Sequence, residues 1–145
     1  MTERKTLDGA CHCGAVRFTV TLAEGLAQPR RCNCSLCRMR GAVVVSAAVG
    51  DLVVTQGADK LTLYQFNTRT AEHYFCSVCG IYTHHKRRSN PDQLGVNVAC
   101  LSGVSPFDFE CVPVYEGAIH PADAAGGACD PVAGILRYEK AGSRS

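Results

Sequence analysis

The stretch that decides the fold lies in the middle of the chain and reads Cys76-Ser77-Val78-Cys79-Gly80. Two cysteines separated by two residues, with glycine after the second, are typical of a zinc knuckle, in which the backbone turns around a metal ion. A knuckle supplies two ligands, whereas structural zinc sites usually have four. The stretch therefore predicts a partner cluster of cysteines elsewhere in the chain.

Two further clusters lie upstream, and they read Cys11-His12-Cys13 and Cys32-Asn33-Cys34-Ser35-Leu36-Cys37. In an extended strand, residues i and i+2 point to one face, so Cys11 and Cys13 can reach the same ion. The spacing does not decide whether the knuckle pairs with the first upstream cluster or with part of the second. Metal binding is favoured because cysteines that act only as small buried apolar side chains would not repeat these spacings.

Seven clustered cysteines cannot complete two four-ligand sites. One closed site leaves three cysteines, and a zinc ion with three protein ligands keeps the open coordination position that is typical of catalytic zinc. The alternative is that a fourth ligand comes from a histidine or from Cys100, Cys111 or Cys129. These three cysteines have no partner at ligand spacing, and the apolar run around Cys100 predicts a buried thiol there.

Length and composition predict one globular domain. The chain has 145 residues, 46% of them hydrophobic and 19% charged, and domains usually contain roughly 100–150 residues. No apolar run approaches the roughly 20 residues that span a bilayer, and the first residues do not read as a secretory signal. We therefore expect a cytoplasmic protein that does not bind membranes. Thiols stay reduced there, so the ten cysteines favour metal over disulfides.

The charge argues against nucleic-acid binding. The formal net charge is +2, and two Zn²⁺ ions on seven thiolates would lower it by three, to about −1. A nucleic-acid-binding domain usually carries a strongly basic surface.

Short segments with β patterns recur along the chain at spacings of about ten residues. They include residues 15–22, 42–45, 52–55, 61–66, 73–75 and 95–100. No long segment has an apolar period of 3.6 residues, so the sequence predicts a mainly β fold of antiparallel sheets with little helix. We expect the domain to cover residues 1–121 and residues 122–145 to form an irregular tail, with a short pairing near Ile135, Leu136 and Tyr138 left open.

Three ordered motifs, Gly9–Phe18, Cys32–Ala42 and Tyr74–Gly80, resemble the glutathione-dependent formaldehyde-activating enzyme family, which includes centromere protein V-like proteins. The resemblance covers about residues 8–121 and implies a β-tent fold of small coiled sheets. It implies two Zn²⁺ ions per chain. The structural ion would be bound by Cys11, Cys13, Cys76 and Cys79, and the catalytic ion by Cys32, Cys34 and Cys37. The activity that it implies is that of a carbon–sulfur lyase, which joins glutathione to formaldehyde.

The residues and the resemblance together predict a protein that forms or handles the hemithioacetal of a small thiol and a small aldehyde. Arg38 and Arg40 are candidates for holding the carboxylates of glutathione, with a solvated charged loop as the alternative. Two other functional classes stay open: a non-catalytic glutathione-binding or carrier module, and a zinc ribbon that binds nucleic acid or protein. The sequence does not indicate the oligomeric state.

Several other side chains are less favoured for a part in the site. Residues 86–88 are basic and could also hold a carboxylate, but a solvated charged loop is the favoured interpretation. His84 and His85 should point in opposite directions from a strand, so at most one would face a site, and a surface role is favoured. The aromatic residues in β patterns are expected in the core: Tyr64, Phe66, Tyr74 and Phe75.

Overall fold

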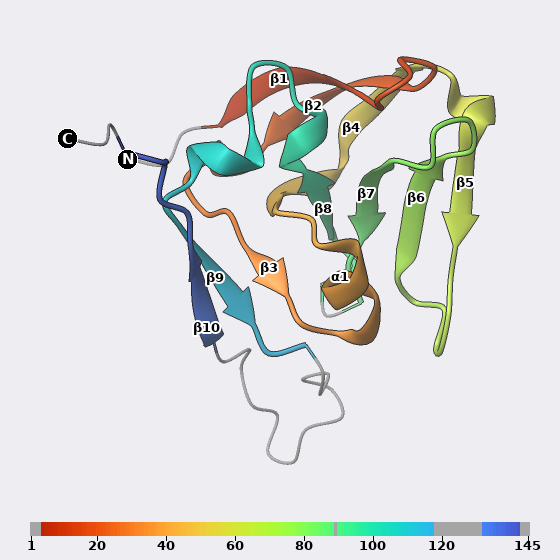
Figure 1. The fold of residues 1–145 in the computed structure, drawn as a ribbon. Coiled ribbons are helices and arrows are strands. Elements are labelled where there is room, and N and C mark those ends of the chain that lie inside the picture. Colours follow the sequence, from red (N-terminus) through yellow and green to blue (C-terminus); the bar gives the residue numbers. More distant parts are fainter. Residues whose placement is uncertain (1–3, 89, 118–131, 143–145) are drawn as a thin grey trace.

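The structure is a computed structural model that describes residues 4–88, 90–117 and 132–142. A seven-stranded sheet carries the core, and a three-stranded sheet lies next to it (Figure 1). All pairings within the large sheet are antiparallel, and the described helices are short. The prediction of a mainly β fold with antiparallel sheets and little helix is confirmed.

The large sheet has the strand order β1-β2-β4-β8-β7-β6-β5. Its strands are Lys5–Ala10 (β1), Arg17–Leu22 (β2), Val44–Gln56 (β4), Leu61–Tyr64 (β5), Glu72–Cys76 (β6), Tyr82–Lys86 (β7) and Gln93–Asn97 (β8). Strand β2 shows the pattern that builds the core, because Phe18, Val20 and Leu22 are buried and alternate with two partly exposed threonines. This period of two places one face of the strand against the interior.

Strand β4 differs from the sequence prediction. The segments 42–45 and 52–55 were expected to be separate strands, but they belong to one strand of 13 residues. Its first part pairs with β8 and its second part with β2. Gly50 lies between the two parts with φ of 99°, a backbone conformation that glycine adopts at little cost. Ala47 pairs with both neighbours, and the register of the β2 pairing shifts between Ala47 and Leu52, the stretch that contains this glycine.

The small sheet has the order β10-β9-β3 and holds Arg31–Cys32 (β3), Cys111–Tyr115 (β9) and Val132–Arg137 (β10). Strand β3 pairs with β9 in parallel. Helix α1, Ser35–Arg40, follows β3 directly, and the other described helices are the short 3₁₀ turns Ala58–Lys60, Val98–Cys100 and Pro106–Asp108. None of the described helices has the length and hydropathy needed to cross a membrane.

Strand β10 lies where the sequence predicted an irregular tail. Its residues pair with β9 through the backbone, and all of their side chains are exposed. A strand with no buried face leaves no alternating pattern in the sequence, which explains why only a short pairing was considered. The rest of the expected tail up to residue 131 lies outside the described residues. The division into 1–121 and 122–145 stays a prediction.

Candidate metal centre and pocket

Two hairpin turns bring Cys11, Cys13, Cys76 and Cys79 together. Their Sγ atoms all lie within 4.8 Å of one another. The Sγ of Cys13 lies 3.6 Å from that of Cys11 and 3.8 Å from that of Cys76. In a tetrahedron with Zn–S bonds of about 2.3 Å, the sulfur atoms lie about 3.8 Å apart. The first cluster therefore has the shape of a tetrahedral four-thiolate site.

Backbone groups support the sulfur atoms of this first cluster. The N–H of Val16 donates to the Sγ of Cys11, and the N–H of Val78 donates to the Sγ of Cys76, each at 3.3 Å. Gly80 has φ of 80°, which lets the chain turn back immediately after the last cysteine. Such N–H donors stabilise thiolates, the form of cysteine that binds metal.

The second cluster lies on one short segment. Cys32 ends β3, Cys34 is the N-cap of α1 and Cys37 lies in its first turn. Their Sγ atoms also lie within 4.8 Å of one another. The N–H of Cys34 donates to the Sγ of Cys32 at 3.4 Å, and the N–H of Cys37 to the Sγ of Cys34 at 3.3 Å. The neighbouring side chains of Cys32 and then Cys37 are the largest of the effects that hold the pKa of the Cys34 thiol well below its usual value.

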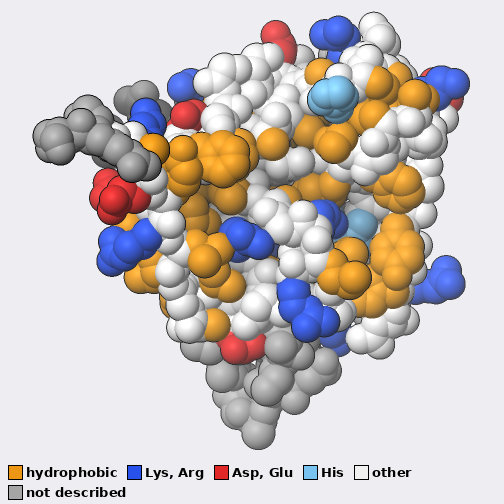
Figure 2. Space-filling view, viewed as in Figure 1, with side chains coloured by type: hydrophobic (Ala, Val, Ile, Leu, Met, Phe, Trp, Pro, Cys, Tyr) orange, Lys and Arg blue, Asp and Glu red, His pale blue; other side chains and the backbone are white. Residues whose placement is uncertain are grey.

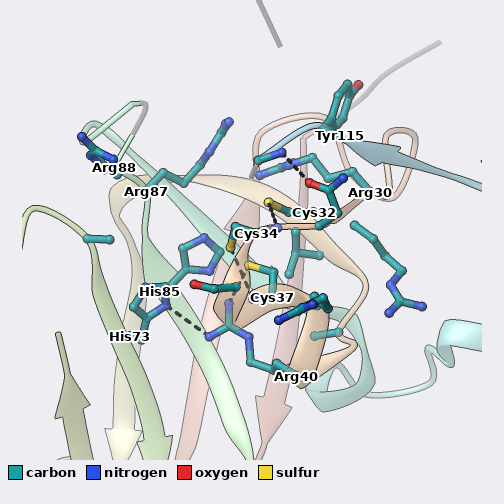
Figure 3. A pocket seen from close by; sticks show the side chains of 18 of the residues that line it. Arg30, Cys32, Cys34, Cys37, Arg40, His73, His85, Arg87, Arg88 and Tyr115 are labelled. Atoms are coloured by element: carbon teal, nitrogen blue, oxygen red, sulfur yellow. Dashed lines mark hydrogen bonds between the residues drawn. The ribbon is translucent and has the colours of Figure 1, made fainter. Parts of the chain in front are cut away.

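A pocket of about 790 Å³ opens over the second cluster (Figure 3). Its lining is rich in cations, and the acidic residues among the described residues that line it are Glu24 and Glu116. Figure 2 shows more basic than acidic side chains on the face that carries α1. The arginines that line the pocket are Arg30, Arg31, Arg38, Arg40, Arg87 and Arg88. An anionic small molecule suits this lining by charge.

The two arginines that the sequence predicted for substrate binding, Arg38 and Arg40, have different environments in the structure. Both line the pocket, but Arg38 is exposed at its rim. Arg40 turns inward, and its guanidinium bonds to the Sγ of Cys37 and to the ring of His73. The guanidinium of Arg38 is thus open to a bound molecule, whereas that of Arg40 is held by the protein.

Arg30 and Arg87 also line the pocket, although no local pattern in the sequence indicates a role for Arg30. Arg30 donates to the Oγ of Ser46 at 2.7 Å, and burial followed by the charge of Arg87 lowers its pKa to about 10. Arg87 lines the pocket and donates to the Oε1 of Gln93 at 2.7 Å. The expectation of a solvated loop at residues 86–88 is wrong, because β7 extends to residue 86 and its pairing with β8 draws the next residues to the pocket.

His84 and His85 point to opposite faces of β7, as alternation predicts, but the expected surface role is wrong. His84 is buried, and its ring stacks on Tyr74 with centroids 4.8 Å apart. The ring of His85 lines the pocket, and its Nδ1 is hydrogen-bonded to the hydroxyl of Tyr82. Burial lowers the pKa of His85 well below its usual value, so the ring is neutral at physiological pH.

Comparison with known proteins agrees with this geometry. Residues 6–116 match the family model described as glutathione-dependent formaldehyde-activating enzyme. The chain belongs to this family. A curated protein of Halomonas elongata, which its name assigns to the same family, is 37% identical over 81 residues. That match covers 50% of this chain and 51% of the relative, so the chain spans about half the length of the curated relative.

A solved structure also resembles this member of the formaldehyde-activating family. The crystal structure of a Rhodobacter sphaeroides protein has 59% sequence identity to the chain and a TM-score of 0.73. The match covers 74% of this chain and 99% of that one.

In this member of the glutathione-dependent formaldehyde-activating family, the second cluster offers three cysteines that could bind a metal ion. Among the described residues, no fourth histidine, cysteine, aspartate or glutamate joins it within 4.8 Å. Cys100 is buried, as expected, and burial raises its pKa to about 12. Cys111 is exposed and accepts a hydrogen bond from Arg137, and Cys129 lies outside the described residues. Each cluster could hold a metal ion, and thiolate donors suit zinc.

The aromatic residues of this family member correct one expectation. Tyr64 and Phe66 were expected in the core, but they are 47% and 37% exposed. Their rings form a continuous stack with those of His73 and His85. Ring centroids are 5.7 Å apart between Tyr64 and Phe66, 5.8 Å between Phe66 and His73, and 5.1 Å between His73 and His85. Phe66 and both histidines line the pocket. The stack thus forms one wall of the pocket instead of part of the core.

Proposed function

We propose that this protein is a zinc-dependent carbon–sulfur lyase. It would form or handle the hemithioacetal of glutathione, or a similar thiol, with formaldehyde or a similar small carbonyl compound. One observation carries the proposal: the three-cysteine cluster and six arginines line the same pocket. Membership of the glutathione-dependent formaldehyde-activating family supports it. We expect the protein to act in the cytoplasm, where its thiols stay reduced.

The proposal assigns two zinc ions per chain to different roles. A structural ion would be bound by Cys11, Cys13, Cys76 and Cys79, and a second, catalytic ion by Cys32, Cys34 and Cys37. The first set provides the four ligands of a closed structural site, whereas the second provides three. Cys32, Cys34 and Cys37 line the pocket, so a small molecule in the pocket could reach a metal ion that they would hold.

The reaction forms a bond between the thiol sulfur and the carbonyl carbon, while the S–H bond breaks and the carbonyl oxygen gains a proton. A zinc ion held by Cys32, Cys34 and Cys37 would supply positive charge that lowers the pKa of an incoming thiol, which is near 8.5 in water. The side chain best suited to move a proton in the pocket is His85. Because Tyr82 engages its Nδ1, its Nε2 is the ring nitrogen that would exchange a proton with the bound molecule.

Arginines would hold the two carboxylates of glutathione. A guanidinium binds a carboxylate with two parallel hydrogen bonds, which fixes its orientation as well as its position. Arg38 at the rim and Arg30 and Arg87 within the pocket are the candidates, since each lines the pocket. Orienting the thiol in this way would align its sulfur with the carbonyl carbon.

Turnover tests the proposal. Exchange spectroscopy by NMR with ¹³C-formaldehyde and glutathione measures how fast the free and adduct forms interconvert. The zinc-loaded protein should accelerate this exchange, and the Cys34→Ser variant should not. Glutathione binding without acceleration would instead favour a carrier module. Absence of both binding and acceleration would refute the proposed function.

A further inference from the structure

The guanidinium of Arg40 lies beside the second cysteine cluster and points toward His73 (Figure 3). Arg40 ends α1, three residues after Cys37, and its Nη2 donates to the Sγ of Cys37 at 3.4 Å. Its Nη1 lies 3.1 Å from the Nδ1 of His73, and its guanidinium carbon lies 3.7 Å from the centre of the Tyr82 ring. The Nε of Arg40 is buried without a hydrogen-bond partner among the described residues. The protein thus holds this cation from three sides.

Two of the three groups that hold the Arg40 cation are neutral. Burial, together with the charge of Arg40, lowers the pKa of His73 to about 4, so its Nδ1 accepts a hydrogen bond as a neutral ring. Burial raises the pKa of Tyr82, so its hydroxyl stays protonated. Among these contacts, only the sulfur of Cys37 can carry a negative charge. Arg40 is half-buried and its Nε is inaccessible, and removing a cation from water is costly unless an anion compensates it.

We propose that Arg40 is the counter-ion of the three-cysteine site and positions Cys37, and that it does not bind substrate. The inference rests on the metal-binding part of the proposed function. Three thiolates and one divalent ion together carry one net negative charge, which Arg40 neutralises. With Arg40 beside it, the metal centre itself would carry no net charge, so an anionic thiol would not be repelled at the point where it approaches the metal. Arg40 lowers the repulsion for every thiol, whether or not the thiol carries carboxylates.

The test compares Arg40→Gln with Arg38→Gln, a variant of the other arginine on α1. Titrations of the cobalt-substituted protein with glutathione and with 2-mercaptoethanol follow thiol binding through the sulfur-to-cobalt absorption bands. Arg40→Gln should weaken binding of both thiols by the same factor, about tenfold or more, whereas Arg38→Gln should affect glutathione alone. Arg40→Gln should also weaken retention of one zinc ion of two by roughly 10–100-fold, the usual effect of removing a partner of a metal ligand.

A second variant keeps the test decisive if Arg40→Gln folds poorly. Arg40→Lys keeps the charge and should retain most of the affinity for 2-mercaptoethanol. A loss in Arg40→Gln that is confined to glutathione would overturn the inference and assign Arg40 to a substrate carboxylate. Unchanged binding of both thiols would also overturn it. A parent protein that binds only one metal ion would refute the metal-binding part of the proposed function, and the inference with it.

Discussion

Gly117 touches the second cluster at a point where no side chain fits. A β-carbon built on Gly117 would lie less than 3.0 Å from the Sγ of Cys32 and 3.3 Å from the Cβ of Cys34. Non-bonded heavy atoms pack best at about 3.5–4.0 Å, so Gly117→Ala must push the sulfur and the β-carbon apart by at least about 0.5 Å. Metal–ligand distances tolerate only about 0.2 Å. We therefore expect Gly117→Ala to remove Cys32 as a ligand.

Zinc content measured by native mass spectrometry checks this prediction. After mild chelation, Gly117→Ala should keep one zinc ion where the parent protein keeps two, with affinity at the second cluster reduced by roughly 100-fold or more. Circular dichroism should show an unchanged fold, because Gly117 lines the pocket and is not one of the residues of the hydrophobic core. Gly134→Ala is the matched control, since a β-carbon there meets nothing within 4 Å. Two zinc ions bound to Gly117→Ala with parental affinity would refute the reasoning.

Three further predictions concern folding, turnover and pH. Cys76→Ser should prevent folding, because a structural zinc site contributes roughly 10–16 kcal/mol to the stability of the folded state. Cys34→Ser should give a folded chain with one zinc ion. Equal unfolding of both variants in circular dichroism would contradict the two roles. In Gly95→Ala, the new β-carbon would lie less than 3.0 Å from the His85 ring and displace it. This variant should therefore lower kcat about as much as His85→Ala does, roughly 10²–10⁴-fold. An unchanged kcat would argue against proton transfer by His85. Burial lowers the pKa of His84 from 6.5 to about 4, so the unfolded state binds the proton more readily than the folded state. The free energy of unfolding should therefore fall by about 3 kcal/mol as the pH falls from about 6.5 to about 4. His84→Gln should flatten that slope in urea titrations at saturating zinc, and parallel profiles would exclude His84 as its source.

The cysteine clusters were predictable because their spacings are local. A tight turn around metal needs ligands within a few residues of one another, and that requirement is visible in the sequence. The pairing of Cys76 and Cys79 with Cys11 and Cys13 was left open by spacing. This pairing depends on the contact between the β6–β7 turn and the β1–β2 turn, which the arrangement of strands in the large sheet determines. The spacing between two neighbouring cysteines contains no information about that arrangement.

The lining of the pocket could not be predicted, because it depends on contacts between distant segments. Arg30 reaches the pocket beside the start of β4. Arg87 reaches it through its contact with Gln93, and Phe66 through its stack on His73. A basic or aromatic residue near the end of a strand has the same local pattern whether it faces solvent or a pocket. Only the assembled sheets distinguish the two.

The two clusters also differ in how much chain they connect. In the first cluster, Cys13 and Cys76 are 63 residues apart in sequence, and closing a loop of that size costs the unfolded chain about 4 kcal/mol of entropy. A metal ion there would stabilise the folded chain by joining the β1–β2 turn to the β6–β7 turn, whose strands lie toward opposite edges of the large sheet. The second cluster lies within residues 32–37, so its metal closes almost no loop. The second metal could therefore exchange ligands with a bound thiol while the fold persists, which a catalytic site needs and a structural site does not.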